Sequence, residues 1–205
     1  MRESTFMQQT STRVMATLAG MCLAGLGLAI HAQQGGSGEV VGNGETTARA
    51  VIQSCSSPSV LGLALLRERA SSEAVKEVEV VIRIWPNTIV PEGKHAVHIH
   101  QTSECKPCSG AGGHFDPGPN SNTSPDGNHP FHAGDLVNID IDKAGQGTLF
   151  ATTTRVTLSD GPLSVFDDDG SAFIIHVNAD TYCPDGASAG CAGGARAACG
   201  LILRD

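Results

Sequence analysis

The chain carries little basic charge: 13 lysines and arginines stand against 21 aspartates and glutamates, for a formal net charge of -8. A chain this acidic is not expected to bind nucleic acid or an anionic membrane by general electrostatic attraction. It also lacks any stretch of sustained helical periodicity, which argues against a helical fold. Its long apolar run, residues 14–30, is too short and too glycine-rich for a typical membrane anchor.

The same apolar run has the features of a secretory signal peptide. Arg2 and Arg13 precede it, and a small residue, Ala32, follows it at the expected cleavage point. Retention of the run as an anchor is the alternative. We therefore expect an exported protein, periplasmic or extracellular, with no membrane contact after cleavage. The expected organisation is a signal peptide at 1–32, a flexible linker at 33–38 and a single domain at 39–205.

Six cysteines lie outside the predicted signal peptide, at positions 55, 105, 108, 183, 191 and 199. An even number of cysteines in an exported protein predicts disulfides rather than free thiols. Metal binding through the pair Cys105-Lys-Pro-Cys108 is the alternative. It is weak, because no second such pair lies at zinc-site spacing.

The rest of the chain reads as short strands separated by turns. Val78, Val80, Ile82 and Ile84 alternate with other residues, as one buried face of a strand requires. Seven such segments predict an all-β antiparallel sandwich or barrel. They are 47–54, 60–67, 75–85, 94–101, 136–142, 148–156 and 173–177. Two long glycine-rich and polar segments, 103–133 and 178–198, interrupt this rhythm and are expected to be functional loops.

The predicted strands and loops carry histidines at spacings that are typical of metal ligands. His98 and His100 are two apart on a predicted strand, so both imidazoles project from the same face. His114 follows fourteen residues after His100, in the first long loop. His132 precedes Asp135 by three residues in a tight turn, and His176 ends a later strand. Imidazole is well suited to copper and zinc, so the pattern predicts a metal site.

Five sequence blocks together resemble the ordered signature of the Cu/Zn superoxide dismutase family. They cover roughly residues 40–205, and several blocks in order are far more specific than one. The blocks are His95-Ala-Val-His98-Ile-His100, Gly112-Gly-His114-Phe-Asp-Pro117, His132-Ala-Gly-Asp-Leu136, His176-Val-Asn-Ala-Asp180 and Gly194-Ala-Arg196-Ala-Ala-Cys199-Gly. The resemblance implies a Greek-key antiparallel β-sandwich or barrel in which two long loops form the metal site.

The resemblance also implies roles for individual residues. The copper ligands would be His98, His100, His114 and His176. His114 would bridge copper to zinc, and His132 and Asp135 would bind zinc. Asp180 would join a copper-site histidine to a zinc-site histidine, a disulfide would join Cys108 to Cys199, and Arg196 would stand at the mouth of the copper channel. The remaining four cysteines allow three pairings, and the spacing of Cys183 and Cys191 suggests the one with a local disulfide there and Cys55 joined to Cys105.

Two histidines need a separate interpretation. The family places a further zinc histidine about eight residues after the bridging one, where this chain has Asn122. We expect His129 to take its place, because structural zinc sites normally have a complete set of protein donors. The alternative is an exposed His129 and an incomplete site. His95 falls on the opposite strand face from His98 and is expected to be a core residue rather than a ligand.

The activity implied by the resemblance is an oxidoreductase reaction, the conversion of superoxide to oxygen and hydrogen peroxide by copper redox cycling. Zinc would be structural, and His114 and Arg196 would be the catalytic residues. A copper- and zinc-binding protein without activity is the main alternative. A zinc hydrolase is a weaker one, since no unassigned carboxylate stands ready as its general base. The residues leave a homodimer open, because the dimer surface varies within the family.

Overall fold

The computed structural model describes residues 45–70, 75–118 and 121–205. Ten strands and one short 3-10 helix make up the regular structure of this part of the chain. They are β1 (Thr46–Ser54), β2 (Val60–Ala70), β3 (Lys76–Ile84), β4 (Gly93–His95), β5 (Val97–His100), η1 (Cys108–Ala111), β6 (Ile139–Ile141), β7 (Gly147–Thr153), β8 (Ala172–His176), β9 (Arg196–Leu201) and β10 (Leu203–Arg204).

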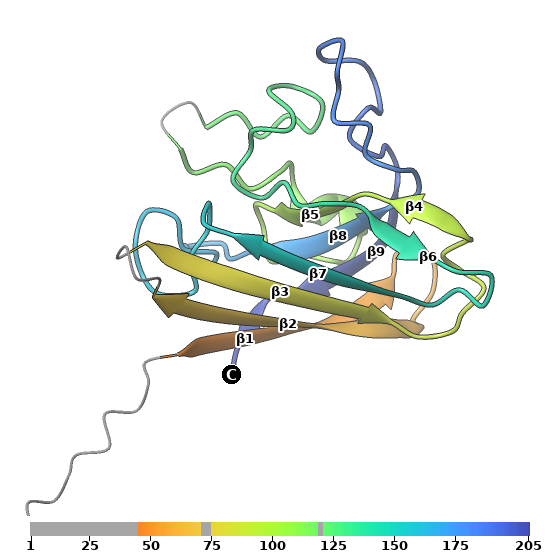
Figure 1. Cartoon of the computed structure of the whole chain (residues 1–205), viewed down its shortest axis with the longest axis horizontal. Coiled ribbons are helices and arrows are strands. Elements are labelled where there is room, and N and C mark those ends of the chain that lie inside the picture. The colour runs from red at the N-terminus through yellow and green to blue at the C-terminus, as the bar shows by residue number, and fades with distance from the viewer. Residues whose placement is uncertain (1–44, 71–74, 119–120) are drawn as a thin grey trace, which may run out of the picture. The chain divides into compact units, whose positions relative to one another are not determined.

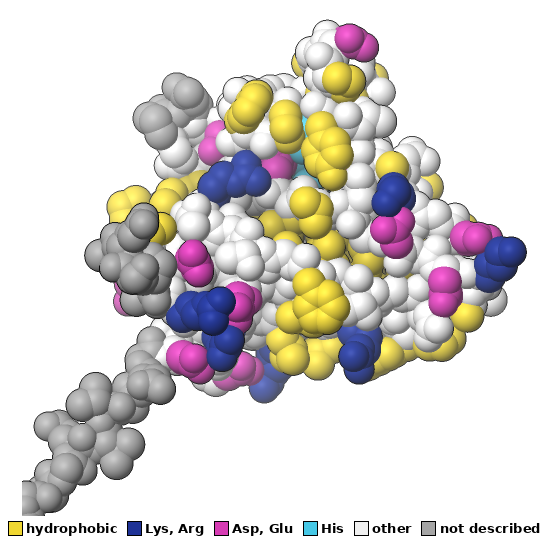
Figure 2. Space-filling model, viewed as in Figure 1, with side chains coloured by type: hydrophobic (Ala, Val, Ile, Leu, Met, Phe, Trp, Pro, Cys, Tyr) yellow, Lys and Arg dark blue, Asp and Glu magenta, His cyan; other side chains and the backbone are white. Residues whose placement is uncertain are grey.

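The core follows from strand alternation. Val78, Val80, Ile82 and Ile84 on β3 are at most 2% exposed, as the sequence pattern predicts. They pack with inward-facing residues of β1, β2, β5 and β8 into one large hydrophobic cluster. Burial of apolar area of this kind is the main driving force for folding. The outer face of the same strands is mixed, and Figure 2 shows apolar side chains there among charged ones.

The strands form one curled antiparallel sheet and a small separate pair. The order in the large sheet is β5-β8-β9-β1-β2-β3-β7, and β4 pairs with β6. From β3 the chain crosses to β5 at the opposite edge of the sheet and returns through β6 to β7 beside β3. This crossover is the Greek-key feature, and the predicted all-β class is confirmed. Figure 1 shows that both long loops leave the sheet on the same side.

The sequence pattern does not predict strand β9. Most of it is small residues, and its first half falls inside the predicted loop 178–198. Its position explains it: β8 and β1 lie on either side, so the backbone of β9 is paired along both edges. A Cβ at Gly200 would lie 2.7 Å from Cδ1 of Ile52 on β1. The backbone oxygen of Val51 would lie 3.0 Å from the same Cβ, so β1 leaves little room for a larger side chain, and glycine carries no apolar strand signal.

The disulfides correct the predicted pairing. Cys55 is bonded to Cys108 and Cys105 to Cys199, so the expected Cys108–Cys199 and Cys55–Cys105 pairs are wrong. The predicted Cys183–Cys191 pair is confirmed. Cys199 lies on β9 opposite Gln53, and the amide of Cys55 donates to Ala197 O. The segment 105–108 is thus bonded to the residue after β1 and to the middle of the neighbouring β9, and spacing alone does not tell which cysteine meets which.

Three predicted features lie outside the described residues. These are the signal peptide at 1–32, the linker at 33–38 and the start of the domain at 39. Within the described ranges, no helix has the length and apolarity that a membrane crossing requires.

The corrected pairing predicts the outcome of removing one cysteine. Cys55→Ser should leave a single free thiol at Cys108, because Cys105 remains bonded to Cys199. Alkylation in denaturant without reductant, followed by peptide mass analysis, locates that thiol. Label at Cys105 instead would contradict the pairing.

Candidate metal centre

Strand β5 presents two buried histidines on one face. Val97 and Ile99 point into the hydrophobic core, whereas His98 and His100 point toward the long loops. Both imidazoles are fully buried, and the face of the molecule in Figure 2 shows only a trace of histidine surface. Burial of two ring systems with polar nitrogens is costly unless those nitrogens find partners. The surrounding loops supply them.

The first long loop is bound to the free edge of β5 at both of its ends. The amide of Phe115 donates to Ile99 O at 2.9 Å, and the amide of Ile99 donates to Gly134 O at 2.8 Å. A Cβ at Gly134 would overlap the carbonyl of Ile99, so glycine is needed for this approach. These backbone bonds place His114 and Asp135 beside β5, opposite His100 and His98 respectively.

Four histidines converge on one point. His176 ends β8, the strand paired with β5, where a register shift follows Ile175. Its Nε2 lies 3.2 Å from Nδ1 of His98 and 3.4 Å from Nε2 of His100. One donor atom from each of His98, His100, His114 and His176 falls in a group whose members all lie within 4.8 Å of one another. We call this group the four-histidine cluster.

In three of these rings, the nitrogen that points away from the cluster lies next to an oxygen atom, a different one for each ring. Nε2 of His98 lies 3.1 Å from Oδ2 of Asp180. Nδ1 of His100 lies 3.0 Å from Gly112 O, and Nδ1 of His176 lies 2.9 Å from Gly194 O. A neutral imidazole that donates from one nitrogen keeps a lone pair on the other. The lone pairs of these rings therefore point toward the centre of the cluster, as metal ligation requires.

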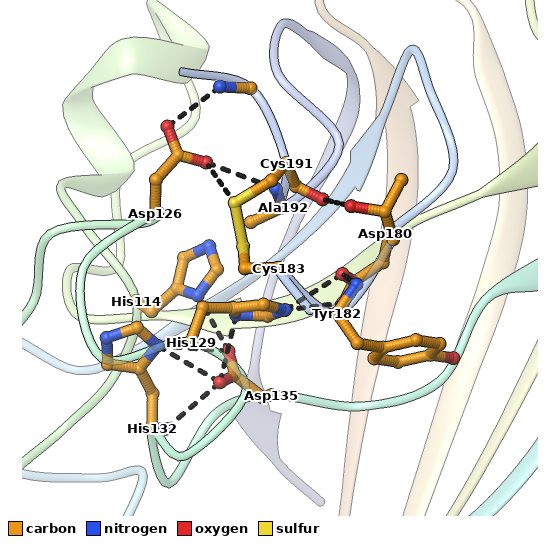
Figure 3. Close-up of a disulfide and its surroundings, with 12 residues drawn as sticks. His114, Asp126, His129, His132, Asp135, Asp180, Tyr182, Cys183, Cys191 and Ala192 are labelled. Carbon is orange, nitrogen blue, oxygen red and sulfur yellow. Dashed lines mark hydrogen bonds and ion pairs between the residues drawn. A yellow bond between two sulfur atoms is a disulfide. The ribbon is translucent and has the colours of Figure 1, made fainter. Parts of the chain in front are cut away.

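A second group of side chains surrounds the carboxylate of Asp135. Its oxygens lie 2.7 Å from Nδ1 of His114, 3.1 Å from Nδ1 of His129 and 3.0 Å from Nδ1 of His132. Figure 3 shows these rings gathered at Asp135, and we call the group the Asp135 cluster. His114 belongs to both clusters, with its Nε2 on the side of the four histidines. The donors here that lie within 4.8 Å of one another belong to His98, His114, His129 and Asp135, and the ring of His132 touches the carboxylate from outside that group.

Asp180 connects the two clusters a second time. Its carboxylate lies 3.1 Å from Nε2 of His98 and 2.7 Å from Nε2 of His129. Its backbone is held by Asn138, whose side chain accepts from the Asp180 amide at 2.7 Å and donates to its carbonyl at 3.0 Å. The amide of Tyr182 also donates to Oδ1 of Asp180 at 2.7 Å, so both the backbone and the carboxylate are held in place.

Unpaired atoms indicate what the clusters are suited to hold. In the described part of the chain, four buried side-chain atoms lack a hydrogen-bond partner. Two of them are Nε2 of His114 and Nε2 of His132, and a third, Nδ1 of His129, lies 3.1 Å from an Asp135 oxygen without good hydrogen-bond geometry. Buried polar atoms are rarely left unpaired without a reason, and an ion is one such reason. The donor types, imidazole nitrogens with one carboxylate, fit copper and zinc.

Burial keeps three histidines of the four-histidine cluster neutral. It lowers the pKa of His114 to about 4 and that of His176 to about 3, and it lowers the pKa of His100 strongly. Neighbouring imidazoles push in the same direction. Neutral imidazole is the form that binds metal, so the cluster has its ligands ready near neutral pH.

The Asp135 cluster has the opposite electrostatics. Burial opposes charge on His129, yet its hydrogen bonds with Asp135 and Asp180 raise its pKa to about 9. Burial would also raise the pKa of Asp135, but hydrogen bonds from His114, His129 and His132 hold it far below its ordinary value. A fixed negative charge at Asp135 therefore attracts a cation into this cluster.

Arg196 lies at the start of β9, opposite His176 on β8. Its guanidinium donates to Cys108 O and Gly112 O. The second of these carbonyls also faces His100 Nδ1, so Arg196 is one peptide group away from the four-histidine cluster. Half-burial lowers the pKa of Arg196 without neutralising a guanidinium.

The other predicted positions separate clearly. His95 is 2% exposed, with its ring nitrogens 2.9 Å from His176 O and Pro91 O, and it belongs to neither cluster. Asn122 accepts from the amide of Ser124 instead of facing Asp135. Sequence reasoning missed the carbonyls of Gly112 and Gly194 because backbone acceptors leave no side-chain signal.

The chain matches the family model described as copper/zinc superoxide dismutase over residues 60–202. It is 36% identical to the superoxide dismutase-like protein YojM of Bacillus subtilis, over 60% of this chain and 62% of that protein. It is also 36% identical to superoxide dismutase [Cu-Zn] 2 of Aquifex aeolicus, over 60% of this chain and 71% of the relative. The superoxide dismutase [Cu-Zn] of Legionella pneumophila is 37% identical, with 56% of this chain and 65% of the relative covered. The chain thus spans about two thirds of the length of these relatives.

A solved structure shares the fold. It is a double mutant of a superoxide dismutase-like protein from Bacillus subtilis in which a tyrosine and a proline are each replaced by histidine. The TM-score is 0.56 at 29% identity, and the match covers 76% of this chain and 96% of that one.

Proposed function

The chain belongs to the copper/zinc superoxide dismutase family, and we propose that it is an exported superoxide dismutase that converts superoxide to oxygen and hydrogen peroxide. The observation that carries this proposal is the convergence of four buried histidines beside a second, carboxylate-containing cluster. His98, His100, His114 and His176 would hold copper. Copper supplies the one-electron redox chemistry, whereas zinc has none of its own and would be structural.

We assign zinc to His114, His129, His132 and Asp135. The support for His129 is its double contact, with Nδ1 toward Asp135 and Nε2 on Asp180. Through Asp180 it is linked to His98, which gives the carboxylate the connecting role that the family resemblance implies. In this assignment His129 serves as the zinc ligand that the family spacing would place at position 122, where this chain has Asn122.

Proton transfer requires an atom that faces the substrate site and can change its bonding. Nε2 of His114 is our candidate, because it is buried, has no hydrogen-bond partner and faces the four-histidine cluster. Asp135 holds Nδ1 of the same ring at 2.7 Å and so fixes its orientation. His114 is therefore the proposed general acid in peroxide formation.

Arg196 addresses an electrostatic problem. A chain with a formal net charge of -8 repels an anion such as superoxide at long range. A guanidinium held beside the copper ligands by two carbonyls creates a local positive potential that attracts it. We propose that Arg196 guides and orients the substrate.

Export rests on the N-terminal signal pattern described above. We propose cleavage near Ala32 and a periplasmic or extracellular mature protein that does not remain membrane-bound. N-terminal sequencing of the secreted product tests this proposal. We leave the homodimer as a hypothesis for measurement of mass in solution.

The function is tested by metal analysis of the purified mature protein together with a superoxide dismutation assay. We expect one copper and one zinc per chain, and activity that is lost on copper removal and restored by copper but not by zinc. Metal binding without dismutation would favour a non-catalytic binding protein of the same fold and would contradict the enzyme proposal.

His129→Ala should lower zinc affinity by about 10- to 100-fold, because it removes a donor that Asp135 and Asp180 both orient. Asn122→Ala is the matched control, since it alters the same loop away from the cluster. Competition for zinc with a chromophoric chelator gives both affinities. Equal affinity in wild type and His129→Ala, or a loss confined to Asn122→Ala, would contradict the assignment.

Arg196→Ala should leave the metal content unchanged, lower kcat/KM, and flatten its dependence on ionic strength, because the local positive potential is lost. Arg196→Lys retains the charge without the two-carbonyl fork and should keep a larger share of the rate. Stopped-flow kinetics over a salt series provides the measurement. Wild-type kinetics in Arg196→Ala would refute the guiding role.

A further inference from the structure

A carboxylate that none of the assigned roles uses lies between the two long loops. Asp126 belongs to the first loop, three residues before His129. Its Oδ2 accepts from the amide of Gly190 at 2.9 Å, and its Oδ1 accepts from the amide of Ala192 at 3.1 Å. Figure 3 shows this carboxylate aimed at the segment around Cys191. Hydrogen bonds from amides to a charged acceptor are among the stronger ones in proteins.

The receiving segment is a hairpin closed by a disulfide. Cys183 and Cys191 are bonded across eight residues and are only 6% and 7% exposed. The Cys191 carbonyl accepts from both the amide and the hydroxyl of Thr181, at 2.9 and 3.0 Å. A short cross-link restricts the conformations of the loop that it closes. The amides of Gly190 and Ala192 are therefore held in place for Asp126.

The contacts form a closed ring between the loops. Ala192 pairs with Asp180 in an isolated β-bridge, and the Asp180 carboxylate contacts His129. The first loop thus meets the second at Asp126 with Ala192, and again at His129 with Asp180. A movement of the loops that breaks one of these contacts therefore disturbs the other.

His129 also has an anchor on its other side. The guanidinium of Arg155, which follows β7, donates to Pro130 O at 3.1 Å and to Asp135 O. This contact ties the segment after His129 to the barrel. In the described structure, the corresponding contact before His129 is the one that Asp126 makes with the hairpin.

We propose that Asp126 and the Cys183–Cys191 hairpin act together as a positioning device for His129, so that zinc affinity depends on a contact between the two loops. The inference rests on the proposed zinc role of His129 and adds a residue that the family resemblance did not identify. Asp126 touches neither cluster and acts only through the loop.

The first measurement needs no metal. In metal-free protein, Asp126→Ala should reduce the hydrogen-exchange protection of the Gly190 and Ala192 amides by about 10-fold or more, because both lose their acceptor. Asp185→Ala is the matched control, since Asp185 is an exposed carboxylate of the same hairpin. It should leave both amides unchanged. Equal protection in wild type and Asp126→Ala would overturn the proposal.

The second measurement is zinc affinity by chelator competition, with zinc ion alone as the probe. Asp126→Ala and the double variant Cys183→Ser/Cys191→Ser should each weaken zinc binding by about 10-fold or more, with copper binding unchanged. Combining all three substitutions should add little, because they break one unit. Should Asp126→Ala fold poorly, Asp126→Asn keeps the shape and one acceptor, and an intermediate loss is expected.

The outcomes separate the two levels of the proposal. If His129→Ala binds zinc as tightly as the wild type, the zinc site proposed here is refuted, whatever the amide exchange shows. If His129→Ala weakens zinc binding but Asp126→Ala keeps full zinc affinity, only the positioning role is overturned. An additive loss in the triple variant also overturns it, because independent contacts would then be at work.

Discussion

The free edge of β5 is the constraint on which the proposed metal centre depends. One edge of this strand pairs with β8, which brings His176 beside His98 and His100. The other edge is taken by the two ends of the first long loop, through the amides of Phe115 and Ile99. Backbone hydrogen bonds fix both edges of the strand, and they bring together histidines that are far apart in the sequence.

The carboxylates then divide the site into two electrostatic halves. The four-histidine cluster is buried, which keeps His100, His114 and His176 neutral, whereas Asp135 stays ionised among the rings around it. Neutral nitrogen donors suit an ion that must change its charge, and a fixed anion suits one that does not. Asp180 joins the halves by contact with His98 and His129. The same carboxylate thus orients one ligand in each cluster.

Much of this could be predicted from the sequence, for identifiable reasons. Alternation on β3 predicted its buried face, and the spacing of His98 and His100 predicted their common direction. The assignment of His114, His176 and Asp135 came from the family resemblance and not from spacing alone. Other features left no such signal. Strand β9 consists largely of small residues, which carry little apolar signal, and its Gly200 packs closely against β1.

The cysteine pairing and the carbonyl acceptors show where sequence reasoning stops. Cys105 and Cys108 are three residues apart and are bonded to the middle of β9 and to the residue after β1, so pairing depends on the path of a turn. Gly112 O and Gly194 O orient His100 and His176, yet any residue has a carbonyl. His129 is a different case, because the sequence already offered it as the remaining zinc ligand, and the loop brings it to Asp135 and Asp180.

The most direct test of the account is the ligand set of copper in the copper- and zinc-loaded protein, measured by X-ray absorption spectroscopy in the oxidised state. The account predicts a first shell dominated by imidazole nitrogens from the four clustered histidines. Removal of His98, which lies at the centre of the contacts, should reduce that imidazole count. A first shell of sulfur or of carboxylate oxygens, unchanged by the loss of His98, would contradict the central claim.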